Sequence, residues 1–186
     1  CNHQMRALLE KIKLVAATDS PVSIVGERGT GKELVAHAIH LNSPRRDQPL
    51  IKVCCADLPE ALLEAELFGH EKGAFPGALR QRRGRFELAH KGTLLIDDID
   101  AVSPNVQARV WRVLQNRRFE RVGGREHIEV DVRIVCASKD DLKGMAYQGR
   151  FHKELSDQLT AVQIVVPPLR ERREDVLVIA EHMLEA

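Results

Sequence analysis

The sequence contains few of the residues that build metal sites and disulfide scaffolds. Its 186 residues include four cysteines, one tryptophan and one tyrosine. Cys1, Cys54, Cys55 and Cys136 have neither the C-x-x-C spacing of a zinc site nor the density of a disulfide framework. The eight histidines lack metal-ligand spacing as well. A zinc site and a disulfide-stapled fold are therefore not expected, and we interpret Cys54 and Cys55 as small buried residues.

Long apolar runs and an excess of one charge are also missing. No run approaches the roughly 20 residues of a membrane helix, and the N-terminus lacks a signal-peptide pattern. The formal net charge is only +1, which gives no general attraction to nucleic acid or membranes. With 44% hydrophobic and 30% charged residues, the composition is typical of a soluble globular protein. We expect a cytoplasmic protein without a membrane partner.

A glycine-rich motif follows the first predicted strand, residues 22–25. Gly26, Gly31 and Lys32 stand at the G-x-x-x-x-G-K spacing of a P-loop, and a predicted helix follows. Backbone N–H groups of residues 28–32 can surround a phosphate, while the Lys32 ammonium neutralises the terminal phosphates. In the general pattern a magnesium-binding Ser or Thr takes the place of Glu33. The candidate nucleotide-binding residues are Gly26, Glu27, Arg28, Gly29, Thr30, Gly31, Lys32 and Glu33.

Further strands alternate with helices, which predicts a parallel sheet with both faces covered. Strands are predicted at 49–58, 92–100 and 130–138, and helices at 60–68 and 104–119. A last helix is predicted at about 174–185, which divides the chain into an α/β unit, 1–173, and the start of a second unit, 174–186.

An acidic pair ends the strand at 92–100, in the run LLIDDID. Asp97 is predicted to lie at the carboxyl edge of the sheet, beside the P-loop, where it can hold a magnesium-bound water. We therefore predict the Walker B role for Asp97, with Asp98 as a weaker catalytic candidate.

The motifs together resemble a known family. GERGTGKELVA, ELFGHEKGAFPGA, GRFELAHKGTLLIDDI, QARVWRVLQNRRFERVGG, VDVRIVCAS and PPLRERREDV resemble, in order and spacing, the central AAA+ domain of bacterial enhancer-binding proteins that activate sigma-54 RNA polymerase. The resemblance implies an α/β AAA+ P-loop NTPase with a five-stranded parallel sheet and a helical lid subdomain. It also implies ATP or ADP and Mg²⁺ as cofactors, homo-oligomeric rings, RNA polymerase as a partner, and DNA binding through a domain outside this sequence. Glu33 is usual in that family.

The resemblance assigns a polymerase-contacting loop, with the family motif GAFTGA, to Gly73, Ala74, Phe75, Pro76, Gly77 and Ala78. Pro76 replaces the threonine that the family uses to engage the sigma factor. Proline lacks the hydroxyl and the backbone donor and fixes φ near −65°. Contact with sigma-54 is therefore not expected in its usual form.

Other departures fall on residues that hydrolyse or sense ATP. Asp98 replaces a glutamate, Cys54 replaces the asparagine that gates it, and Lys139 replaces a γ-phosphate-sensing amide. His152 and Gln158 stand where the family has two arginines that reach the neighbouring subunit's nucleotide. An arginine finger contributes about 10³ to 10⁵ in rate. We therefore predict slow or absent hydrolysis.

Three hypotheses for the function remain open from the sequence. The first is a nucleotide-binding regulatory domain with little turnover. The second is a slow ATPase that still remodels sigma-54 polymerase. The third is a domain that responds to cyclic di-GMP, which some relatives bind here.

Overall fold

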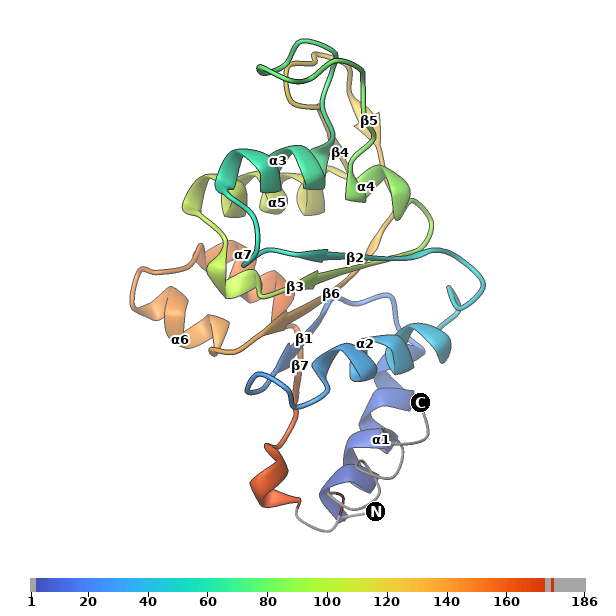
Figure 1. The fold of residues 1–186 in the computed structure, drawn as a ribbon. Coiled ribbons are helices and arrows are strands. Elements are labelled where there is room, and N and C mark those ends of the chain that lie inside the picture. The colour runs from blue at the N-terminus through green and yellow to red at the C-terminus, as the bar shows by residue number, and fades with distance from the viewer. Residues whose placement is uncertain (1–2, 173–174, 176–186) are drawn as a thin grey trace.

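A five-stranded parallel sheet forms the centre of the molecule, in the order β2-β3-β6-β1-β7 (Figure 1). This computed structural model describes residues 3–172 and 175. The strands of the sheet are β1 Val22–Val25, β2 Leu50–Cys54, β3 Thr93–Asp97, β6 Arg133–Ser138 and β7 Val162–Val165. All four strand pairings are parallel. The predicted fold, a five-stranded parallel sheet flanked by helices, is confirmed.

Helices cover both faces of this sheet. One face packs against α1 His3–Ala16 and α2 Lys32–Leu41, and the other against α3 Glu60–Phe68, α4 Arg85–Leu88, α5 Pro104–Asn116, α6 Leu142–Tyr147 and α7 Lys153–Leu159. In β6, Ile134 and Cys136 face the second layer while Val135 and Ala137 face the first. Because both faces are buried, the strands read as continuous apolar runs.

The helix predicted at 104–119 is shorter than expected. It ends at Asn116, because Arg117 takes a left-handed conformation with φ 52° and its N–H donates to the Val113 carbonyl. Residues 118 and 119 then form β4, Arg118–Phe119, which pairs antiparallel with β5, Ile128–Glu129. Strand pairing with a distant segment therefore overrides the local helical pattern.

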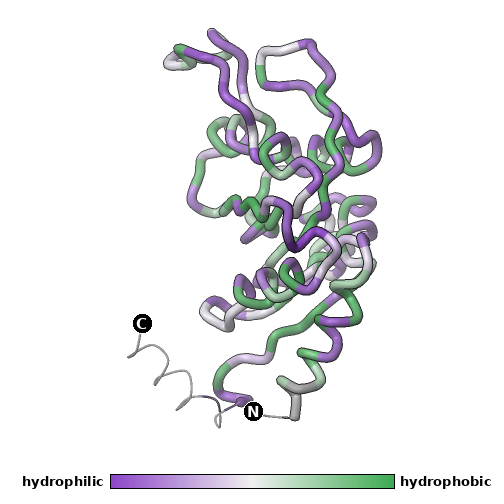
Figure 2. Tube along the Cα trace, turned by 90° about the vertical axis from the view of Figure 1, so that its right-hand side faces the viewer, coloured by the Kyte–Doolittle hydropathy of each residue, from purple (hydrophilic) through white to green (hydrophobic). Residues whose placement is uncertain are grey.

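Two loops project from the α3–α5 side, away from the sheet: residues 70–82 and the β4–β5 connection (Figure 1). Figure 2 shows long hydrophilic stretches along these loops, whereas hydrophobic stretches concentrate around the central sheet. The two short 3-10 helices are η1 Ile99–Ala101 and η2 Leu169–Glu171. The helix predicted at about 174–185 lies outside the described residues apart from residue 175, so the division into 1–173 and 174–186 stays a prediction.

Within the described part of the chain, every helix is too short or too polar to span a bilayer.

Candidate nucleotide-binding site

The P-loop joins β1 to α2 at the carboxyl edge of the sheet. Gly29 and Gly31 have φ of 76° and 89°, in the left-handed region that favours glycine. At Gly26 a Cβ would lie 2.9 Å from Thr30 Oγ1 and 3.0 Å from the Val166 carbonyl oxygen. The glycines therefore permit a tight turn whose backbone lies close to its neighbours.

The Lys32 side chain lies inside this loop and is only 8% exposed. Its Nζ donates to the carbonyl oxygens of Gly26, at 2.8 Å, and Glu27, at 3.0 Å. The Thr30 hydroxyl also donates to the Glu27 carbonyl, at 2.8 Å. The loop is therefore closed around a positive charge at the N-terminus of α2, an arrangement suited to a phosphate.

The P-loop and the acidic end of β3 line one hollow of about 460 Å³. Parallel strands place their carboxyl ends at one edge of the sheet, which explains why two segments distant in sequence meet there. The lining residues are Arg28, Gly29, Gly31, Lys32, Glu33, Leu34, Asp97 and Asp98. Five of the eight predicted nucleotide-binding residues therefore line one hollow with both predicted Walker B residues, whereas Gly26, Glu27 and Thr30 do not line it.

Asp98 and Cys54, two of the predicted site positions, lie close together. Cys54 pairs in register with Asp97, and its Sγ lies 4.0 Å from Asp98 Oδ2. Burial is the main cause of a raised pKa at the Cys54 thiol, which keeps it protonated and able to donate weakly. Asp98 itself is left-handed, with φ 52°, and its N–H donates to Asp97 Oδ1 at 3.1 Å.

The interpretation of both neighbouring cysteines as buried was half wrong. Cys55 is 3% exposed, whereas Cys54 is partly exposed. The strand alternation turns Cys54 toward the polar edge of the nucleotide hollow and Cys55 into the core.

Residues of this hollow fit a magnesium ion that arrives with a nucleotide. Asp97 and Glu33 offer carboxylate oxygens, the ligands that Mg²⁺ prefers, beside the phosphate-binding loop. Among the described residues no group of three His, Cys, Asp or Glu side chains could hold a metal alone. This agrees with the usual binding of Mg²⁺ by one or two carboxylates together with substrate phosphates.

The two positions of the family's arginine fingers, His152 and Gln158, lie in the helical layer on the sheet face opposite to α2. Leu155 and Leu159 of α7 belong to the core on the face opposite to α2, so His152 and Gln158 are not brought into the hollow. Lys139, the predicted sensor position, directly follows β6 and is exposed.

Both side chains at the finger positions are engaged within the chain. His152 is the N-cap of α7: its Nδ1 accepts from the Leu155 N–H at 3.2 Å, and its ring lies 5.3 Å from the Trp111 ring. Gln158 Oε1 accepts from Gln115 Nε2 at 3.0 Å.

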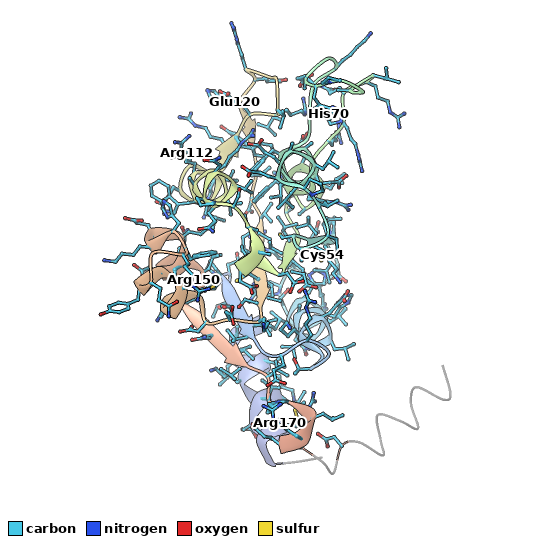
Figure 3. The ribbon with its side chains drawn as sticks, turned by 60° about the vertical axis from the view of Figure 1, so that its left-hand side comes forward. Cys54, His70, Arg112, Glu120, Arg150 and Arg170 are labelled. Atoms are coloured by element: carbon cyan, nitrogen blue, oxygen red, sulfur yellow. The ribbon has the colours of Figure 1, made fainter. Side chains whose placement is uncertain are left out.

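The predicted partner loop is a compact, hydrogen-bonded turn. The Gly73 N–H donates to the Ala78 carbonyl at 2.8 Å, and the Ala78 N–H donates to the Phe75 carbonyl at 3.0 Å. Ala74 and Phe75 are partly buried, and the Phe75 ring lies 4.9 Å from His70. Pro76 and Gly77 form the exposed tip. In Figure 3, His70 lies at the distal end of the molecule, Cys54 at the sheet, and Arg170 at the opposite end.

Arg121 joins the two projecting loops, a role that the sequence did not indicate. It donates to both oxygens of Glu87, at 2.9 and 2.7 Å, and to Glu71 at 2.9 Å. The bond from Arg121, followed by one from Gln81, lowers the pKa of Glu71. Because Glu71 and Arg121 are 50 residues apart, no local pattern could have shown the contact.

The contacts of three basic side chains beside the P-loop were missed as well. Arg170 donates to both oxygens of Glu27, at 2.8 and 2.7 Å, and the buried Arg172 donates to the Thr30 carbonyl at 2.6 Å. Lys52 lies 2.7 Å from Glu33 and 3.5 Å from Asp97. The alternation in LIKVC, which puts Lys52 and Cys54 on one face, was the available signal.

Comparison with known proteins gives one consistent family. A family model described as "Sigma-54 interaction domain" matches residues 1–165. The chain is 53% identical over 181 residues to a Nif-specific regulatory protein of Herbaspirillum seropedicae, covering 97% of this chain and 33% of that protein. It is 52% identical over 171 residues to the regulatory protein AtoC of Escherichia coli, covering 92% and 37%. The chain thus spans about a third of these relatives.

Solved structures agree. NtrX from Brucella abortus, in a crystal structure with ATP, is 37% identical and superposes with a TM-score of 0.90 over 99% of this chain and 41% of that one. The P-loop NTPase domain of a sigma-54 transport activator from E. coli, at 17% identity and TM-score 0.60, covers 89% of this chain and 95% of that one. The second likeness supports the fold alone.

Proposed function

Because the chain belongs to the family of sigma-54 interaction domains, we propose that it is the nucleotide-binding AAA+ domain of a bacterial transcription regulator. It binds ATP or ADP with Mg²⁺ and hydrolyses ATP slowly or not at all. The observation that carries this proposal is that Lys32 and Asp97 line one hollow, while His152 and Gln158 are engaged elsewhere. DNA binding belongs to a part of the regulator outside this sequence, and the domain acts on RNA polymerase as an oligomer.

Each residue of the hollow has a distinct part in this proposal. Backbone N–H groups of residues 28–32 and the Lys32 ammonium bind the phosphates, and Asp97 would hold the Mg²⁺ that accompanies them. Bound Mg²⁺ would neutralise charge on the terminal phosphates. Asp98 is one methylene shorter than the glutamate of the family, so its carboxylate is withdrawn from the water it should polarise. Misplacement of about 1 Å can cost on the order of 10²-fold in rate.

A second candidate is a slow ATPase that remodels sigma-54 polymerase. It is favoured by the order of the projecting loop, residues 70–82. Internal hydrogen bonds close this loop, and Arg121 holds it through Glu71, as a defined partner contact would require. Pro76 at the exposed tip counts against the usual contact, because it offers neither hydroxyl nor N–H.

Calorimetric titration of ATP and ADP with Mg²⁺, combined with phosphate release at low and high protein concentration, tests these alternatives. We expect binding by the wild-type chain, a loss of at least about 100-fold in Lys32→Ala because a buried charge partner is removed, and near-baseline release. Lys143→Ala, on an exposed turn of α6, is the matched control.

Release that rises with protein concentration would favour the remodelling ATPase. If the chain bound no adenine nucleotide and was instead stabilised against heat by cyclic di-GMP, the proposal would be overturned in favour of the cyclic di-GMP hypothesis.

A further inference from the structure

Lys52 places a positive charge on the metal side of the nucleotide hollow. It lies on β2, the outermost strand next to β3, and its side chain is 38% exposed. Its Nζ donates to Glu33 Oε2 at 2.7 Å and lies 3.5 Å from Asp97 Oδ2. The Lys52 ammonium therefore contacts both carboxylates at once.

Glu33 and Asp97 are the two carboxylates of the hollow that offer oxygens to a metal. Glu33 is the second residue of α2, directly after Lys32, and Asp97 ends β3. Without Lys52 these carboxylates would place two negative charges beside a site that has to accept a polyanion. With Lys52, the three side chains carry a net charge of about −1.

We propose that the Lys52 ammonium partly neutralises the carboxylates of Asp97 and Glu33. Its positive charge thereby sets how strongly nucleotide binding depends on magnesium. This inference rests on the proposed nucleotide-binding function. Lys52 is a positioning residue: it holds the two carboxylates toward each other and partly takes the place of the metal's charge when no metal is present.

The proposal predicts opposite effects for its two partners. Removing the Lys52 charge makes the group more negative, which weakens binding of metal-free nucleotide and strengthens the benefit of Mg²⁺. Removing the Glu33 charge makes the group neutral and reduces that benefit. A change of one unit charge beside the hollow, partly screened by solvent, changes each affinity by about threefold to tenfold.

The test measures the dissociation constant of ADP by calorimetry, once with excess Mg²⁺ and once with a chelator, and takes the ratio of the two. Lys52→Met should raise the ratio of chelated to magnesium-bound constants about threefold to tenfold, and Glu33→Gln should lower it. Lys52→Met combined with Glu33→Gln restores the net charge and should return the ratio to near the wild-type value. Lys52→Arg and the exposed Lys143→Met should leave it unchanged.

Thermal melting of each variant shows that it folds, and Glu33→Gln, on an exposed helix position, tests the idea even if Lys52→Met is unstable. Unchanged ratios in both single variants would overturn the role of Lys52 while leaving nucleotide binding intact. A double variant that keeps the low ratio of Glu33→Gln would show that the ratio depends on the Glu33 oxygens and not on the charge of Lys52, and would equally overturn the proposal. If the wild-type chain binds no ADP, the proposed function itself has failed, and this inference fails with it.

Discussion

The P-loop and α7 differ in how their polar side chains are used. In the P-loop, Lys32 lines a hollow of about 460 Å³, and its Nζ donates to two carbonyls of the same loop. In α7, His152 caps its own helix and Gln158 bonds to a glutamine of α5. One region places its polar groups at an open hollow, whereas the other uses them for hydrogen bonds within the chain.

This difference separates binding from turnover. Phosphate binding needs a glycine turn, a helix N-terminus and one ammonium, all of which one subunit supplies. Rapid phosphoryl transfer also needs charge at the γ-phosphate, which the family draws from a neighbouring subunit. A histidine whose Nδ1 accepts from a backbone N–H and a neutral amide provide no permanent charge.

The largest effect is expected when positive charge is restored at the two positions of α7. His152→Arg together with Gln158→Arg should raise phosphate release by about 10³-fold where subunits assemble, because an arginine finger is typically worth at least that. The rate per subunit should rise with protein concentration, and Lys153→Arg, at the neighbouring exposed position, should change little. Release that stays at baseline would show that the missing fingers are not the limiting loss.

A smaller effect is expected at the end of β3. Asp98→Glu with Cys54→Asn restores a longer carboxylate and an amide partner across the 4.0 Å contact. When these changes are added to the variant with His152→Arg and Gln158→Arg, we expect a further gain of up to about 10²-fold in phosphate release. The longer carboxylate reaches the water that attacks ATP more closely. Nucleotide affinity should be unchanged. A change in affinity without a change in rate would place this pair in binding rather than in catalysis.

The projecting loop, residues 70–82, is ordered by internal hydrogen bonds and exposes its tip, as a surface available to a partner would. Pro76→Thr returns a hydroxyl and an N–H, each worth about 1 kcal/mol when bonded. Affinity for sigma-54 in a pull-down with ATP should therefore rise by up to about thirtyfold, and Ala74→Thr, at a partly buried position of the same loop, should not produce this gain. Equal binding by both variants would count against a role for the tip.

The sequence predicted the sheet and the site edge well, because these depend on local patterns. Apolar runs predicted the strands, and G-x-x-x-x-G-K with the acidic end of LLIDD predicted two segments that indeed share a hollow. Long-range contacts were not predictable in this way. Arg121 meets Glu71 across 50 residues, and Arg170 meets Glu27 across 143. The engagement of His152 and Gln158 also depends on tertiary packing against α5.

The smallest effect concerns Asp100, between the nucleotide hollow and the layer of α7. Burial, followed by repulsion from Asp98 and Asp140, raises its pKa, and its Oδ1 has no hydrogen-bond partner among the described residues. A raised pKa means that the ionised form destabilises the fold above the folded-state pKa and has no effect below the unfolded value of 3.8. Asp100→Asn should therefore raise the Tm by about 1–3 °C at pH 7 and lose this gain toward pH 4. Asp47→Asn, whose carboxylate is 86% exposed, should show no such trend, and a gain that is constant with pH would assign the effect to packing.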